Sequence, residues 1–207
     1  MDSESLDIQV IGGSIMGQYT TRMLTDEEAK KIIETIKHGY INADGTKRRP
    51  NDQIATILLL QCNLGCRIND IMHLETSSIV PDGDGFRLDI VEQKTHKKRT
   101  FVVPKAIKNI IDDYTTRYGI SCGRLFDVSA PAVWKSLRQV SAFLGLNNVS
   151  CHSFRKAAGL RVYMDSGKDI ALTCQYYQHA APSTTMKYLQ RNTKQMDDVL
   201  SASILLP

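Results

Sequence analysis

Long apolar runs and an ordered set of cysteines are both missing from this chain of 207 residues. Its longest apolar runs, such as 57–60 and 204–206, are far shorter than the roughly 20 residues that span a bilayer, so no membrane span is predicted. The five cysteines are scattered and contain no CxxC pair, which argues against a disulfide framework or a zinc ribbon. Because the amino terminus is acidic and polar, unlike a secretory leader, we expect a cytoplasmic protein with reduced thiols.

Acidic residues are absent from three stretches that hold fourteen of the 26 lysines and arginines. These stretches are Gln93–Lys108, Val128–Met164 and Ile170–Met196. A carboxylate among phosphate contacts would repel a polyanion, so the distribution of charge favours a polyanion-binding surface more than the modest net charge of +4 does. Chance could produce one such stretch, but it is a weaker explanation for three.

The local patterns predict a mainly α fold with a small antiparallel β-sheet. Residues 1–24 lack sustained periodicity and are expected to form a flexible tail, which leaves one folded domain at 25–207. Thr25 begins a capping box, and alternating apolar residues at 86–91 predict a strand that pairs with 101–103. Helices are expected at 25–40, 54–65, 67–74, 105–118, 130–144, 153–166, 168–177, 182–189 and 193–205.

A metal centre is not indicated by the spacing of possible ligands. Cys62, Cys66 and His73 match no zinc ligand set. The acid pairs at 112–113 and 197–198 are adjacent on predicted helices, where neighbouring side chains diverge. Buried cysteines and solvated acids are the simpler interpretation.

Four other places combine cationic, imidazole and phenol side chains. Each is a weak signal alone, because an HxxR pair usually lies on a surface and a tyrosine late in an amphipathic helix is usually half-buried packing. Their order along the chain strengthens the signal. They are Arg67 at the start of a short helix, Lys94 at a hairpin tip, His152 and Arg155 three residues apart on one helical face, and His179 nine residues before Tyr188.

This set resembles the catalytic set of the tyrosine recombinases, the phage integrase family. The resemblance rests on Arg67 in LGCRINDIMHL, Lys94 in a hairpin, the HxxR motif, and the segment HAAPSTTMKYL, which begins at His179 and contains Tyr188. It covers about residues 25–205. It implies the recombinase catalytic-domain fold at 25–207 and cleavage and rejoining of double-stranded DNA through a 3′-phosphotyrosyl link to Tyr188. Since that covalent link conserves the bond energy, no cofactor is expected.

The resemblance also implies a role for each of the other residues. Arg67 and Arg155 would hold the phosphate oxygens, a task suited to a planar guanidinium that is always charged. His152 would act as acid or base, and His179 would donate a hydrogen bond to the phosphate. Lys94 would protonate the departing 5′ oxygen.

Several further residues have two interpretations. Asp70 would orient Arg67 in preference to capping its helix, and Trp134 would pack in the core in preference to stacking on a base. The apolar stripe of the helix at 193–205 would pack on its own domain or dock into a neighbouring protomer of a tetramer. Four cations would contact the DNA backbone or keep the surface soluble, namely Lys156, Arg161, Lys187 and Arg191. The hairpin residues Lys97, Lys98 and Arg99 would contact DNA, and Lys97 and Lys98 fit phosphate contacts better than the role of proton donor.

The chain departs from the family pattern in two ways. Gln178 stands where the family commonly has glycine, directly before His179. Many relatives also carry an amino-terminal helical domain that closes around the duplex, for which residues 1–24 are too short, so we expect a catalytic fragment or a small relative with weak, salt-sensitive DNA binding. The alternatives in function are a type IB topoisomerase and a non-catalytic DNA-binding regulator.

Overall fold

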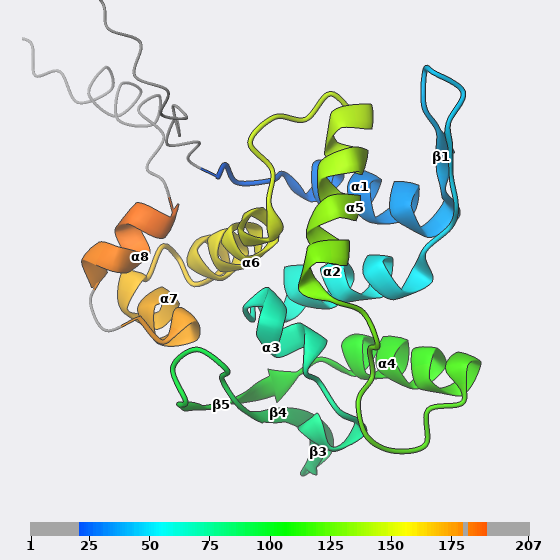
Figure 1. Cartoon of the computed structure of the whole chain (residues 1–207). Coiled ribbons are helices and arrows are strands. Elements are labelled where there is room, and N and C mark those ends of the chain that lie inside the picture. Colours follow the sequence, from blue (N-terminus) through cyan, green and yellow to red (C-terminus); the bar gives the residue numbers. More distant parts are fainter. Residues whose placement is uncertain (1–20, 180–181, 190–207) are drawn as a thin grey trace, which may run out of the picture.

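The computed structural model describes residues 21–179 and 182–189, and helices form most of this part of the chain (Figure 1). The helices expected within it are present, with ends that differ by a few residues. The helix expected at 193–205, and all but the last four residues of the expected tail, lie outside the described residues. The helices are α1 (Asp26–His38), α2 (Asp52–Leu64), α3 (Ile68–Met72), α4 (Lys105–Tyr118), α5 (Ala130–Phe143), α6 (Cys151–Asp165), α7 (Ile170–Tyr177) and α8 (Pro182–Leu189).

The helix boundaries follow from local chemistry. Thr25 and Glu28 form the expected capping box at the start of α1, each side chain accepting from the backbone N–H of the other. Gly65 ends α2 in the left-handed conformation, with φ 59°. A Cβ atom at Gly65 would lie 2.0 Å from the hydroxyl oxygen of Tyr176, so only glycine allows α7 to approach this turn.

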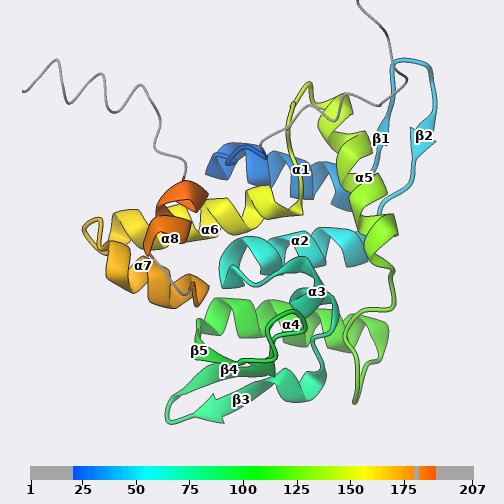
Figure 2. The same ribbon diagram turned by 60° about the vertical axis from the view of Figure 1, so that its left-hand side comes forward.

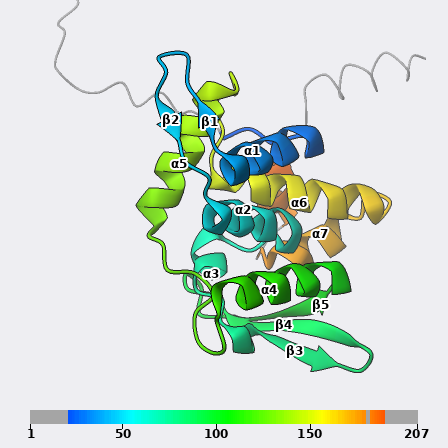
Figure 3. The same ribbon diagram turned by 90° about the vertical axis from the view of Figure 1, so that its right-hand side faces the viewer.

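The expected hairpin is part of a three-stranded antiparallel sheet of β3 (Ile79–Asp82), β4 (Gly85–Val91) and β5 (Lys98–Val103), preceded by a 3₁₀ turn, η1 (Thr76–Ser78). Three strands were not expected from the sequence. β1 (Tyr40–Ile41) and β2 (Lys47–Arg48) form a second hairpin, which projects from the helices (Figure 3). β3 includes Pro81 and Asp82, because the turn before β4 is confined to Gly83 and Asp84.

The helices and the sheet are stacked in layers, as Figure 2 shows. α2 lies at the centre, packed against α1 and α6, while α4 lies between α2 and the sheet. Ile57, Leu58 and Leu60 of α2 are completely buried there. The burial of the central helix on all sides explains why its sequence is an almost continuous apolar run.

Trp134 does not belong to the core, contrary to the prediction. Its side chain is 53 % exposed, whereas Val133, Leu137 and Val140 form the buried stripe of α5. The positions i, i+4 and i+7 define that stripe, and Trp134 is rotated about 100° away from Val133 on the helix.

Within the described residues, no helix is long and apolar enough to cross a membrane. The five cysteines all lie within these residues and are free thiols.

Candidate active site

Arg155 connects the end of α2 with the end of α7. Its side chain is only 2 % exposed, and its guanidinium donates to the carbonyl oxygen of Gly65 at 2.6 Å and to that of Tyr177 at 3.1 Å. The guanidinium carbon also lies 5.0 Å from the centre of the Tyr177 ring. Gly65 is two residues before Arg67, so these contacts place Arg155 next to the turn that carries Arg67.

Glu92 holds Arg67 and the tip of the β4–β5 hairpin together. This carboxylate is completely buried and accepts hydrogen bonds from Arg67 Nη1 at 2.5 Å and from Thr95 Oγ1 at 2.6 Å. Arg99 Nη1 lies 3.5 Å from its other oxygen. Burial alone would raise the pKa of Glu92, but the hydrogen bonds from Thr95 and Arg67 and the charges of the two arginines outweigh it and lower the pKa. Glu92 is therefore an anion fixed behind the cations.

His152 is the second residue of α6 and experiences several positive charges. The surrounding protein atoms disfavour the charged imidazolium and lower the pKa of His152. The charges of Arg155, Lys156, Arg67 and Lys94 lower the pKa further. The hairpin tip and the α2–α3 turn thus both lie close enough to act on this imidazole, which is neutral at neutral pH.

His179 follows α7 and is held by a residue of α8. Its Nδ1 lies 2.9 Å from Oγ1 of Thr185, and its ring stacks on Tyr177 with 4.9 Å between centroids. Burial first, and then the charges of Arg155 and Arg67, lower the pKa of His179 to about 4, although Glu92 opposes this shift. His179 is therefore uncharged at neutral pH and belongs to the same electrostatic cluster as the two arginines.

The structure therefore brings five of the six predicted side chains, Arg67, Lys94, His152, Arg155 and His179, to one region of the fold. Tyr188, the sixth predicted residue, lies in α8. This helix packs against α6 and α7, which carry or flank three of the other five (Figure 1). Three helices, the α2–α3 turn and one hairpin thus supply the set from distant parts of the sequence.

The cations predicted to contact DNA fall into different environments. Lys97 and Lys98 are exposed on the hairpin, with Lys98 Nζ 3.1 Å from Asp89. Arg99 is 1 % exposed, next to the rings of Phe101 and Tyr176, and is thus a buried structural cation rather than an exposed one. The same correction applies to Lys156, which is buried and donates to the carbonyl oxygen of Thr21. Lys187 lies in α8, and Arg191 lies outside the described residues.

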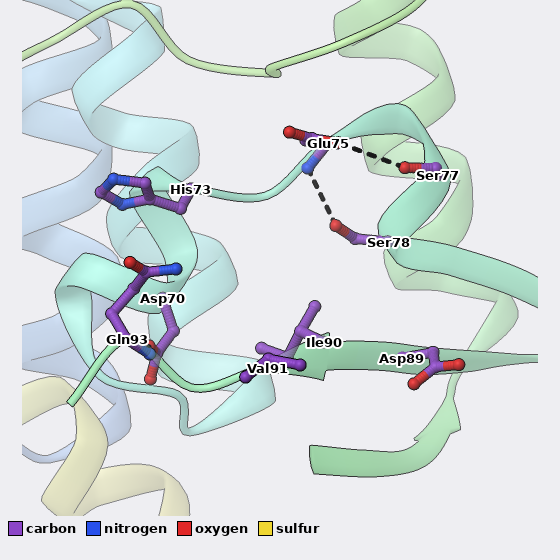
Figure 4. A pocket seen from close by; sticks show the side chains of 9 residues that line it. All are labelled: Asp70, His73, Glu75, Ser77, Ser78, Asp89, Ile90, Val91 and Gln93. Carbon is purple, nitrogen blue, oxygen red and sulfur yellow. Dashed lines mark hydrogen bonds between the residues drawn. The ribbon is translucent and has the colours of Figure 1, made fainter. Parts of the chain in front are cut away.

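Asp70 does not orient Arg67 by a hydrogen bond, contrary to the interpretation favoured by the sequence. It is buried, and its Oδ1 accepts from the backbone N–H of Gln93 at 2.8 Å. Figure 4 shows Asp70 and Gln93 side by side in a pocket between α3 and β4. Asp70 therefore anchors the base of the hairpin tip at Gln93, the residue directly before Lys94.

Sequence reasoning missed Glu92 and Thr185. Glu92 borders the acid-free stretch that begins at Gln93, and Thr185 is three residues before Tyr188 in the same helix. Neither position has a residue type or spacing that marks it, because each acquires its role from a partner that is distant along the chain or across a turn.

Comparison with known proteins decides the family. The profile of the phage integrase family matches residues 22–195. The chain belongs to the phage integrase family. A curated relative, "Probable integrase/recombinase YoeC" of Bacillus subtilis (strain 168), is 30 % identical over 139 residues, which cover 64 % of this chain and 75 % of the relative. The resemblance proposed from the motifs is thus confirmed at the level of the family.

Solved structures of the family have the same fold. XerH site-specific recombinase bound to the palindromic difH substrate, in a post-cleavage complex, matches with a TM-score of 0.67 and 16 % identity over 87 % of this chain. XerA recombinase matches with a TM-score of 0.65 and 17 % identity over 91 % of this chain and 67 % of its own. The catalytic domain of bacteriophage HP1 integrase matches with a TM-score of 0.58 and 15 % identity, over 88 % of this chain and 95 % of that domain. The chain spans about half of XerH, 53 % of its length. These matches confirm the predicted catalytic-domain fold.

Proposed function

We propose that this protein is a site-specific DNA recombinase or integrase that cleaves and rejoins strands of double-stranded DNA through a 3′-phosphotyrosyl intermediate on Tyr188. The observation that supports this proposal best is the convergence of two arginines, one lysine and two histidines beside the helix that carries Tyr188, in a chain of the phage integrase family. These are the groups that phosphoryl transfer requires around a phosphodiester.

Arg67 and Arg155 would stabilise the charge that develops on the non-bridging oxygens of the phosphate. Such stabilisation is most effective when the donors are fixed before the reaction begins. Both arginines are fixed in this structure, Arg67 by the buried carboxylate of Glu92 and Arg155 by the carbonyl oxygens of Gly65 and Tyr177. A guanidinium carries five N–H donors, so one side chain can bond to more than one partner at a time.

His152 would accept the proton of the Tyr188 hydroxyl as the phenol oxygen attacks phosphorus. A free phenol has a pKa of about 10 and needs such a base. The lowered pKa of His152 supports this choice between acid and base, because it keeps the imidazole neutral and able to accept a proton. His179, also neutral, would donate from Nε2 to the phosphate while Thr185 holds Nδ1.

Lys94 would protonate the leaving oxygen. As the bond from the tyrosine oxygen to phosphorus forms, the bond from phosphorus to the 5′ oxygen breaks, and that oxygen keeps the electron pair and takes a proton from the Lys94 ammonium. The products are a 3′-phosphotyrosine and a free 5′-hydroxyl. Reversal of these steps with the 5′-hydroxyl of another strand completes the exchange.

Four cations would contact the DNA backbone, namely the exposed Lys97 and Lys98 of the hairpin, together with Lys187 and Arg191. We further propose that the protein acts in the cytoplasm and assembles as a tetramer on DNA, with the helix expected at 193–205 docked into a neighbouring protomer. Crosslinking of the DNA-bound protein tests this assembly, since crosslinked species no larger than a dimer would contradict it. Removal of 193–207 is expected to abolish the tetramer and leave cleavage of a single site measurable.

The test of the proposed function is covalent trapping on DNA. Random-sequence duplexes are enriched for binding to the full chain, and the enriched duplex is remade with a nick at successive positions so that the short 5′-hydroxyl strand is lost after cleavage. We expect a covalent adduct that peptide mapping assigns to Tyr188. Tyr188→Phe is expected to abolish the adduct and leave DNA affinity nearly unchanged, because only the phenol oxygen is removed.

Other outcomes of this experiment support the alternative functions. Binding without an adduct at any nick position would support a non-catalytic regulator. An adduct combined with relaxation of supercoiled plasmid, but without joining of two separate sites, would support a topoisomerase of type IB.

A further inference from the structure

Gln178 has a backbone conformation that is unfavourable for glutamine. It ends α7 in the left-handed region, with φ 55° and ψ 37°. Glycine adopts this conformation without steric cost and asparagine adopts it more readily than most residues, whereas a longer side chain adopts it rarely. The presence of glutamine at a position where the family commonly has glycine therefore suggests that its side chain is used.

The Gln178 side chain bonds to the hairpin that carries Lys94. Its Nε2 donates to the carbonyl oxygen of Lys98 at 3.0 Å, across 80 residues of sequence. Lys98 is the first residue of β5 and pairs with Val91, the last residue of β4. The bond is therefore made at the end of the β4–β5 ladder, directly beside the turn that contains Lys94.

Another contact between α7 and β5 is made by the next residue of the strand. The guanidinium of Arg99 lies 5.5 Å from the ring centre of Tyr176 in α7 and 5.0 Å from that of Phe101 in its own strand. Gln178 instead bonds at the first residue of the strand. The next residue in the chain is His179, whose backbone N–H donates to the carbonyl oxygen of Cys174 in the last turn of α7.

We propose that Gln178 is a positioning residue that fixes the Lys94 turn relative to the His179 turn. The inference rests on the proposed function, in which Lys94 protonates the 5′ oxygen and His179 bonds to the same phosphate. These two groups come from different elements, and a small displacement of a proton donor slows transfer severely. The hydrogen bond of Gln178 joins the two elements at the residues next to these groups.

The first test measures the mobility of the turn in the free protein. Gln178→Gly and Gln178→Asn both tolerate the left-handed conformation, but glycine has no amide and asparagine is one methylene too short to reach Lys98. We expect both variants to keep the melting temperature of the wild type while hydrogen exchange at residues 92–98 becomes several-fold faster. Gln175→Asn, the same shortening at an exposed position of α7, is the control and should exchange as the wild type does. Unchanged exchange in both Gln178 variants would overturn the proposal.

The second test identifies the affected step with two substrates. On the trapped duplex from the preceding section, we expect Gln178→Gly and Gln178→Asn to cleave about tenfold more slowly than wild type, since their proton donor is less well placed. When the 5′ oxygen at the cleavage site is replaced by sulfur, the leaving thiolate needs no proton, and the variants should cleave at the wild-type rate. A merely structural defect would slow both substrates equally, and that result, or a wild-type rate on the oxygen substrate, would overturn the proposal. A wild-type protein that cleaves neither substrate would instead refute the proposed function, while the exchange experiment would still decide whether the Gln178 bond holds the turn.

Discussion

Arg155→Lys should reduce both the stability of the fold and the rate of DNA cleavage, by separable amounts. In the wild type the guanidinium spans two carbonyl oxygens, those of Gly65 and Tyr177, and lies against the Tyr177 ring. Lysine keeps the positive charge but presents one nitrogen in place of a planar fork. A single ammonium cannot reproduce both bonds with the original geometry, so at least one buried carbonyl oxygen loses its charged donor.

The structural loss sets the size of the effect on stability. A hydrogen bond to a charged group contributes about 1.5–3 kcal/mol, so we expect the free energy of unfolding to decrease by about 2 kcal/mol. For a domain of this size, each kcal/mol lowers the melting temperature by roughly 2–4 °C, which gives a decrease of roughly 4–8 °C. For cleavage, loss of an oriented donor to the transition state costs at least about 2 kcal/mol, equivalent to a rate about 30-fold lower.

The assay combines thermal unfolding with single-turnover cleavage of the nicked duplex, at a temperature where every variant is folded. Arg161→Lys is the matched control. Arg161 lies on the same helix and also donates to a backbone carbonyl, that of Cys62, but it is not among the groups that act on His152 or His179. The control should lose stability and keep its cleavage rate. If Arg155→Lys cleaves at the wild-type rate under these conditions, Arg155 does not hold the phosphate and the assigned role is wrong.

Three further predictions concern the residues around the arginines. Glu92→Gln leaves the charge of Arg67 without its buried partner, so we expect the free energy of unfolding, measured with urea, to decrease by about 3 kcal/mol and cleavage to slow. Unchanged stability would refute the role of Glu92. Thr185→Val keeps the side-chain volume but removes the hydrogen bond to His179, so cleavage should slow about fivefold, corresponding to about 1 kcal/mol, in the same single-turnover assay. The pKa of His179 is about 4 in the folded protein, below its ordinary value, so the unfolded chain binds more protons between these two values. Stability should therefore be complete above about pH 6.5 and decrease as the pH falls toward 4. His152 contributes in the same direction, and His179→Gln should flatten the dependence of the urea midpoint on pH, so an unchanged slope would refute the assignment.

The parts of the fold that could be predicted from sequence are those set by local chemistry. The capping box at Thr25 gave the start of α1, and the helix end expected at residue 65 agrees with the end of α2 at Leu64, which Gly65 follows as the cap. The β1–β2 hairpin escaped prediction because each strand has two residues, too few to show alternation. β3 escaped because Pro81 reads as a turn residue, although proline is tolerated on an edge strand such as this one.

The interpretation of Asp70 failed for a definable reason. Spacing of three residues brings two side chains together only when both residues are helical. α3 begins at Ile68, and Arg67 precedes it in an extended conformation with φ −65° and ψ 150°, so Asp70 does not follow Arg67 on a helical face. The partner of Arg67 comes from the hairpin instead, 25 residues later, and no local pattern could indicate Glu92.

The position of Glu92 also shows how an acid can belong to a phosphate-binding site. The stretch of sequence without acids begins directly after it, at Gln93, and includes the exposed Lys94, Lys97 and Lys98. An exposed carboxylate there would repel a phosphate, but Glu92 is completely buried and bonded to Arg67, so its charge lies behind the cations rather than beside the ligand. The absence of acids is thus a rule for the side chains that face the ligand. One buried acid at the border of the stretch satisfies that rule and fixes the direction in which Arg67 presents its charge.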